Sequence, residues 1–265
     1  MNIKQSYLFF LISTVTAISM RTLMLFFVID TTSGFIKTEY MTGFIIMTII
    51  IAVSVILSFV FCYLAKPTVA TRQPKGIFMK IISPILALVI LYDTFYSTME
   101  YSVTQWQKNL EILLAIAAAT SLIIFSVAKI LGFDFPPVIT IFPVLFWLIR
   151  LIIIFSSFSS LANITDNIFE MATLCLMLLA FLNASRLSVF EISSKKQTLT
   201  FALLISATSL CFITSVSRAI VIVSGNSAIL HKNDLPLLTN LVAGLYLLFF
   251  TLEAFPVNLN RHRYK

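Results

Sequence analysis

The chain has 265 residues, of which 59% are hydrophobic and only 11% are charged, and its formal net charge is +7. A soluble domain carries about 25% charged residues, so a soluble fold of this composition would lack the polar surface needed to cover it. The composition excludes an ordinary soluble domain and predicts a protein embedded in a lipid bilayer.

The apolar residues fall into blocks that are long enough to cross a membrane. Residues 40–65 and 197–217 contain no Asp, Glu, Lys or Arg, and roughly 20 apolar residues span the hydrocarbon core. In chain order, the predicted spans are residues 6–29, 41–64, 78–99, 110–131, 138–158, 168–187, 198–223 and 236–255. The sequence therefore predicts one transmembrane domain, residues 1–265, built as an all-α polytopic helical bundle of about eight spans.

The charged residues outside the spans predict the orientation of the bundle. One side, with both termini, holds twelve basic residues and the opposite side holds three. The twelve are Lys4, Lys66, Arg72, Lys75, Lys80, Lys129, Arg186, Lys195, Lys196, Arg261, Arg263 and Lys265, and the three are Lys37, Lys108 and Lys232. Cytoplasmic loops carry such an excess, so we expect both termini to lie in the cytoplasm, with the bundle in the plasma membrane. The net charge is then a topology signal, and no nucleic-acid partner is expected.

One ionisable residue recurs inside each odd-numbered span. These residues are Arg21, Asp93, Arg150 and Arg218, and each precedes by 16 or 18 residues an acid at the outer start of the next span: Glu39, Glu111, Asp166 and Asp234. The helix dipole favours acids at such positions, but it does not account for the interior charges. Repeated helical hairpins, related in parallel, and the dipole effect alone remain alternative explanations.

Five residues form the candidate polar site inside the membrane: Arg21, Asp93, Arg150, Glu170 and Arg218. Even a low estimate puts the cost of Arg or Asp at a helix centre at about 2.5–3.5 kcal/mol. Such residues must therefore be paired, be hydrated or reach an interface. Counted along the helices, they lie in the middle and outer half of the bundle. Glu253, near the inner end of the last span, is expected to reach the headgroups instead.

Three interpretations of these charges remain open. They form ion pairs that fix helix packing, with Arg150–Glu170 and Arg21–Asp93 as partners; or they line an outward-facing pocket; or the arginines reach the outer headgroups. Three Arg against two acids leave one positive charge in excess. Arg binds carboxylate and phosphate with two hydrogen bonds, so the pocket interpretation predicts a small anionic ligand as a partner besides the lipid bilayer.

Two prolines lie in the inner part of odd-numbered spans. Pro84 and Pro143 precede Asp93 and Arg150 by nine and seven residues. Proline cannot donate the backbone hydrogen bond of a helix, so each is expected to release a carbonyl group there.

No catalytic signature is present. The two histidines, His231 and His262, do not form a two-histidine metal motif on a helix, and no hydrolase or nucleotide-binding fingerprint occurs. We therefore expect no enzyme activity, no metal site and no cofactor.

Part of the chain resembles a known group of proteins. The residues are Phe146-Trp147-Leu148-Ile149-Arg150, then Asn163-Ile164-Thr165-Asp166-Asn167-Ile168-Phe169-Glu170, then Asn183-Ala184-Ser185-Arg186-Leu187. This stretch, about forty residues long, resembles uncharacterised polytopic membrane proteins of anaerobic Gram-positive bacteria. The resemblance implies a bacterial cytoplasmic membrane and carries no activity.

Two classes of function follow from the sequence. The first is a small-solute transporter or ligand sensor with a polar site in the outer half of the bundle. The alternative is a non-catalytic accessory or scaffolding membrane protein, whose internal charges only fix helix packing.

Overall fold

The structure, a computed structural model, describes residues 3–28, 36–65, 67, 76–100, 105–132, 137–157, 164–189, 193–225 and 236–256. These residues form eight α-helices. They are α1 (Ile3–Leu23), α2 (Met41–Leu64), α3 (Ile77–Glu100), α4 (Gln105–Leu131), α5 (Ile141–Ser157), α6 (Ile164–Val189), α7 (Ser194–Val223) and α8 (Pro236–Ala254). The predicted all-α bundle is confirmed.

Three short helices adjoin the long ones. A π-helix, η1 (Met24–Val28), continues α1, while the 3-10 helices η2 (Thr38–Tyr40) and η3 (Pro137–Thr140) precede α2 and α5. π-Helical turns are rare and are frequent at functional sites. The one here begins three residues after Arg21.

The long helices have the dimensions and surface of membrane spans. Seven of them in the described part of the chain are long and apolar enough to cross a membrane, and the apolar part of α8 is shorter, Leu238–Ala254. Large apolar side chains cover the outside of the bundle, including Ile49 and Ile56 on α2 and Phe155 on α5. Contiguous apolar surface of this extent is typical of a protein that faces lipid. The fold is that of a multi-pass membrane protein.

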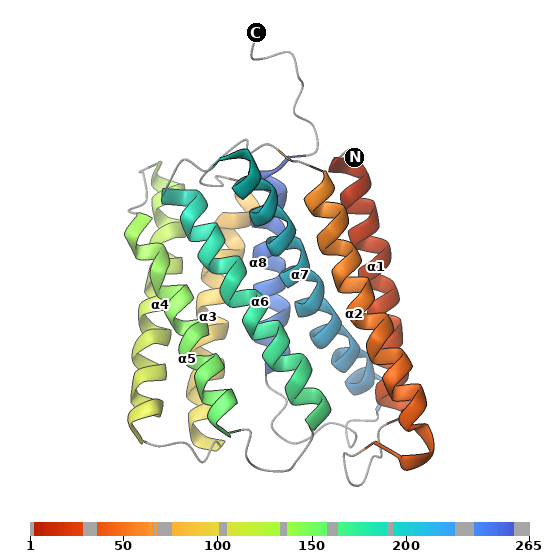
Figure 1. Cartoon of the computed structure of the whole chain (residues 1–265). Helices are drawn as coiled ribbons and strands as arrows, with labels where there is room; N and C mark the ends of the chain where they lie inside the picture. The colour runs from red at the N-terminus through yellow and green to blue at the C-terminus, as the bar shows by residue number, and fades with distance from the viewer. Residues whose placement is uncertain are drawn as a thin grey trace.

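Six helices form a closed ring. Each helix from α3 to α7 packs against the next one along the chain, α7 packs against α8, and α8 returns to pack against α3 (Figure 1). The hairpin of α1 and α2 lies outside this ring, where both helices contact α7. Helix α7 is therefore the wall between the ring and the hairpin, and it is the most buried span.

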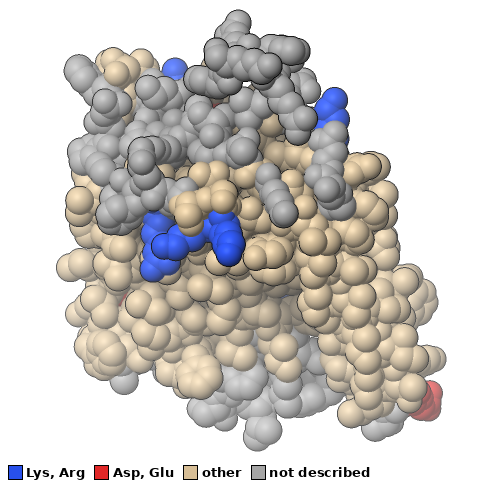
Figure 2. All heavy atoms as spheres, turned by 45° about the horizontal axis from the view of Figure 1, so that its top comes forward, with Lys and Arg blue, Asp and Glu red and all other residues tan. Residues whose placement is uncertain are grey.

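The two ends of the bundle differ in charge. We call the end where α1 begins and α8 ends the terminal end, and the opposite one the distal end. Basic side chains gather at the terminal end (Figure 2), where the described basic residues include Lys4, Arg186, Lys195 and Lys196. Other members of the predicted basic set, among them residues 66, 72, 75 and 261–265, lie outside the described residues.

A hydrogen bond at the terminal end ties α8 to α3. The backbone N–H of Gly76, just before α3, donates to Glu253 Oε2 of α8 at 2.7 Å. Glu253 is half-buried and accepts one of the N–H groups that the first turn of a helix leaves without an internal partner. Glu253 therefore contributes to ring closure, in place of the purely interfacial role expected from its position near a helix end.

Pro84 has the effect expected from the sequence. It lies inside α3 and cannot donate to the carbonyl of Lys80, four residues earlier. Ser126 Oγ of α4 donates to that carbonyl at 2.6 Å. The carbonyl that proline releases is therefore used to join two neighbouring ring helices. Pro143 differs because it lies in the first turn of α5. The backbone N–H groups of a first turn donate no hydrogen bond within the helix, so proline removes none there.

Candidate functional site

The ionisable residues inside the bundle lie at one level near the distal end. Arg21, Asp93, Arg150 and Arg218 lie five to seven residues before the ends of their helical segments, and Glu111 and Glu170 lie six residues after the starts of theirs. At 1.5 Å per residue, this level is about 8–11 Å from the helix ends. All five residues predicted from the sequence belong to this charged layer, and Glu111 is an additional member.

The clearest contact in the charged layer joins Arg150 of α5 to Asp93 of α3. Arg150 Nη2 and Asp93 Oδ2 form an ion pair, and the two side chains are 5% and 3% exposed. Helix α4 packs against both α3 and α5, so this ion pair spans the inner side of α4. The predicted pairing of Asp93 with Arg21 is wrong, because α1 lies outside the ring and the carboxylate binds Arg150. The Arg150–Glu170 pairing stays a prediction.

Glu111 of α4 is a residue of the charged layer that sequence reasoning placed incorrectly. It was assigned to the outer surface, but its side chain is only 5% exposed. It lies on α4, which packs against α3 and α5, the two helices that carry Asp93 and Arg150. Helical spacing offers a signal that could have found it, since Glu111 continues the stripe of Ala115, Ala118 and Leu122 on one face of α4.

The equivalent acid of the first hairpin behaves differently. Glu39, in η2, is exposed, whereas Glu111 is buried. Asp166 and Asp234 do not bear on this point, since the Asp166 side chain and the whole of Asp234 lie outside the described residues. The hairpins α1–α2 and α3–α4 are therefore not equivalent at this position, and an internal repeat stays a prediction.

Glu170 and Arg218 lie on helix faces that point into the ring. Glu170 shares its face of α6 with Phe181, eleven residues later, and Phe181 stacks on Tyr246 of α8 with 5.5 Å between ring centroids. Arg218 follows Cys211 on α7 by seven residues, and Cys211 packs closely against Gly244 of α8. Each ring helix from α3 to α7 thus contributes one ionisable residue to the layer.

Helix α8 contributes a buried hydroxyl near its distal end, three residues after the helix begins. Thr239 is 1% exposed and precedes Tyr246 by seven residues, so it lies on the same inward face. Its Oγ1 has no hydrogen-bond partner among the described residues. The layer inside the ring therefore consists of Asp93, Glu111, Arg150, Glu170, Arg218 and Thr239.

Arg21 occupies a different environment, outside the ring. Its guanidinium carbon lies 4.2 Å from the centroid of the Phe169 ring of α6, and its Nη1 donates to Met24 Sδ at 3.7 Å. Thr48 of α2 donates to the same sulfur at 3.9 Å. Arg21 is 1% exposed and lies where α1, α2 and α6 meet α7. It belongs to the packing of the outer hairpin.

The formal charge of the site changes once these positions are known. The sequence count set three Arg against two acids. Among the described side chains, the interior of the ring contains two arginines, Arg150 and Arg218, and three acids, Asp93, Glu111 and Glu170. The excess inside the ring is thus one acid, because Arg21 lies outside and Glu111 lies inside.

Aromatic side chains fill the ring at its middle. Trp147 of α5 lies 5.9 Å from Phe181 of α6, measured between ring centroids, and Phe181 in turn stacks on Tyr246 of α8. Trp147 is fully buried, and it precedes Arg150 by less than one helical turn. These three rings separate the charged layer from the terminal half of the ring.

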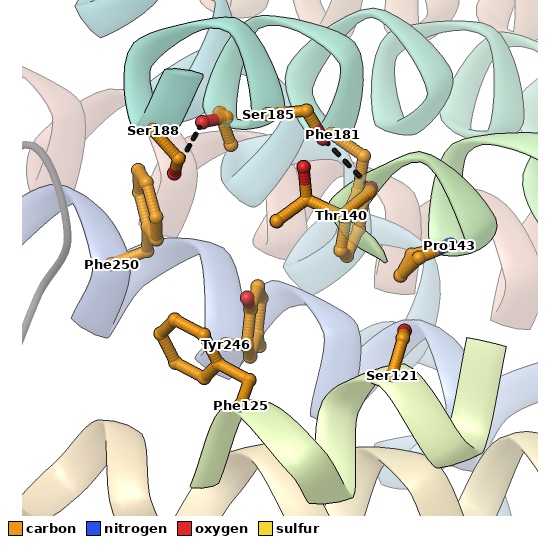
Figure 3. Close-up of a pocket in the computed structure, with 10 residues that line it drawn as sticks. Ser121, Phe125, Thr140, Pro143, Phe181, Ser185, Ser188, Tyr246 and Phe250 are labelled. Atoms are coloured by element: carbon orange, nitrogen blue, oxygen red, sulfur yellow. Dashed lines mark hydrogen bonds between the residues drawn. The ribbon is translucent and has the colours of Figure 1, made fainter. Parts of the chain in front are cut away.

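A small cavity, lined mainly by apolar surface with a few hydroxyl groups, lies on the terminal side of the aromatic rings. It has a volume of about 30 Å³, close to the space of one water molecule. Its lining comes from α4, η3, α5, α6 and α8 (Figure 3): Ser121, Phe125, Thr140, Pro143, Phe181, Ala184, Ser185, Ser188, Tyr246 and Phe250. Ser185 Oγ donates to the Thr140 carbonyl at 2.9 Å across this cavity.

No protein family, curated protein or solved structure matches this chain. In the part of the chain that the structure describes, no group of three or more His, Cys, Asp or Glu side chains is placed to hold a metal ion. The fold and the charged layer define a multi-pass membrane protein with ionisable residues buried between its helices.

Proposed function

We propose that this protein is a small-solute transporter whose polar site is the charged layer inside the ring. The observation that supports the proposal most directly is the buried group of Asp93, Glu111 and Arg150. Intramembrane ionisable residues that face a bundle interior commonly mark solute, ion or proton pathways. A ligand sensor would use the same site without moving the solute.

The distribution of polar side chains along the ring supports a path through it. The charged layer lies toward the distal end, and the cavity with Ser121, Thr140, Ser185 and Ser188 lies toward the terminal end. Trp147, Phe181 and Tyr246 close the ring between them. A charged layer on one side of these aromatic rings and hydroxyl groups on the other would let a polar solute make contacts on both sides of a central closure, as alternating access requires.

The charge of the layer bears on the ligand class. An anionic ligand was expected from an excess of Arg, and the ring instead contains three acids and two Arg. We therefore propose a small polar solute bound by opposite charges on either side, with a zwitterion as the class that fits best. Purely anionic compounds remain an arm of the test.

Thermal stability of the purified protein tests this proposal. A panel of zwitterionic, anionic, cationic and neutral polar compounds should contain one that raises the unfolding temperature, because a ligand that binds only the folded state stabilises it. Arg218→Gln should remove that gain, and Arg186→Gln, an exposed arginine at the terminal end, should keep it. Uptake of the same compound into proteoliposomes then separates a transporter from a sensor. A panel without effect, or an equal gain in Arg218→Gln, would contradict the proposal.

One observation favours the scaffold as a second candidate. The Arg150–Asp93 ion pair joins two helices that flank α4, as a charge that only fixes packing would do. A scaffold would bind no compound of the panel, and its ring variants would change stability alone.

We propose that the terminal end faces the cytoplasm of a bacterial cell, because basic residues gather there. A reporter active only in the cytoplasm should give signal when it is fused after Lys196 or at the C-terminus. Fusions near Lys37 and Lys108 should be silent. A silent C-terminal fusion would overturn this orientation.

A further inference from the structure

Two buried acids, Asp93 and Glu111, and one buried arginine, Arg150, lie at the same level inside the ring. Asp93 of α3 forms the ion pair with Arg150 of α5, and Glu111 is buried on α4, which packs against both of these helices. The three side chains are at most 5% exposed. Asp93 Oδ1 has no hydrogen-bond partner among the described residues. The group therefore has acceptor capacity that Arg150 does not fill.

The charged groups around Glu111 come from every helix packed against it. Helix α3 supplies Asp93 and α5 supplies Arg150, while on α4 itself Lys108 lies three residues earlier and is half-buried. Lys108 is nearer the helix end, where its long side chain reaches headgroups. Arg218 of α7 and Glu170 of α6 lie at the same level and carry opposite charges. The described layer with all its acids ionised therefore has one negative charge in excess, and an uncompensated charge in low dielectric is strongly destabilising.

We propose that this group binds one proton, which resides on Glu111 while Arg150 pairs with Asp93. The reaction is simple uptake of a proton by a carboxylate to give a neutral carboxylic acid. The protonated Glu111 can donate a hydrogen bond to the neighbouring carboxylate, which supplies the missing partner. A metal ion fits less well, because the described residues offer no group of three ligands for one.

This inference rests on the proposed function in one respect: exchange of the proton during solute movement requires that the protein is a transporter. Occupancy of the site by a proton does not depend on transport. It is therefore measured on the protein alone, and its failure can be told apart from the failure of the thermal-shift panel.

Infrared spectroscopy of the purified full chain in lipid at neutral pH tests the proposal. A protonated carboxyl group absorbs apart from carboxylates, and its band shifts in heavy water. The parent should show such a band, and Glu111→Gln should lose it. Asp93→Asn should also lose it, because Arg150 is then free to pair with an ionised Glu111. Glu39→Gln, which removes an exposed acid near the same end, should keep the band.

Stability gives a second readout that guards against misfolded variants. If Glu111 is protonated, Gln is a neutral replacement of the same shape, and the unfolding temperature of Glu111→Gln should stay close to that of the parent. A parent without the band, or a band that persists in Glu111→Gln, overturns the proposal. A parent without the band that is stabilised by sodium chloride but not by choline chloride would assign the group to a cation.

Discussion

Arg21 and Arg150 lie at the same depth of the bundle, each seven residues from the distal end of its helical segment, yet their surroundings differ. Arg150 is inside the ring and ion-paired to Asp93. Arg21 is outside the ring, stacked on Phe169 and bonded to the sulfur of Met24. Depth in the membrane therefore does not define what a buried arginine does. The role of a buried arginine depends on the helices that surround it, and these helices differ between the ring and the hairpin.

The largest expected effect comes from removing Arg150. Arg150→Met leaves Asp93 and Glu111 together in low dielectric and should lower the free energy of unfolding by about 3–5 kcal/mol. The double variant Arg150→Met, Asp93→Leu removes both partners and should recover much of that loss. Thermal or denaturant unfolding in detergent measures both values.

Arg186→Met is the matched control, since Arg186 is exposed, and it should leave stability unchanged. A double variant as unstable as Arg150→Met would show that the ion pair is not the interaction being removed.

The next effect concerns the closure of the ring. A Cβ on Gly76 would collide with the Glu253 carboxylate, so Gly76→Ala should displace the carboxylate from its hydrogen bond with the Gly76 N–H. The expected cost is about 1.5–3 kcal/mol, the range for hydrogen bonds to charged groups. Gly43→Ala in α2 is the control because nothing lies within 4 Å of its Cβ position. That change should stabilise α2 slightly through helix propensity. Equal destabilisation by both changes would contradict a role for Glu253.

Substitutions around Arg21 should destabilise the protein less than the removal of Arg150 does. Phe169→Leu removes the aromatic face under Arg21 and should lower the unfolding free energy by about 1–2 kcal/mol, combining the cation–π contact with lost packing. Phe155→Leu provides the control, because Phe155 is 71% exposed on the outside of α5. A loss as large as that of Arg150→Met would erase the contrast between the two arginines.

The smallest effect is expected at the carbonyl that Pro84 releases. Ser126→Ala removes the hydroxyl that binds the Lys80 carbonyl and should cost about 1 kcal/mol. Ser19→Ala removes a hydroxyl that bonds only to its own helix, at the Val15 carbonyl, and should have little effect. The difference between the two unfolding temperatures measures this helix–helix hydrogen bond. No difference would mean that another group satisfies the carbonyl.

The helices could be predicted because hydrophobic length and charge-free runs are local properties of the sequence. The predicted span 41–64 coincides with α2, and the ends of the others differ by a few residues. The helical turns around Gln105–Asn109 and Ser194–Gln197 were missed because polar residues continue a helix beyond the hydrocarbon, where hydropathy gives no signal.

The composition of the site could be predicted only in part. Buried Arg and Asp inside apolar runs are visible in the sequence, but their partners depend on which helices are neighbours. Asp93 was matched with Arg21 because nothing local shows that α1 packs outside the ring. Glu111 was placed at the surface because a position near a helix start is compatible with a headgroup contact. Glu111 shares its face of α4 with Ala115 and Ala118, but this face identifies Glu111 as buried only when the neighbouring helices are known.

The route by which the ring closes has a consequence for biosynthesis. Helix α8 joins α7 to α3, so during translation the ring stays open until the last span has entered the membrane. Asp93, Glu111 and Arg150 come from three consecutive helices, and they can meet as soon as α5 has been inserted. Arg150 and Asp93 can therefore pair long before closure, so the nascent chain does not have to keep these two ions apart in lipid while it waits for its final helix.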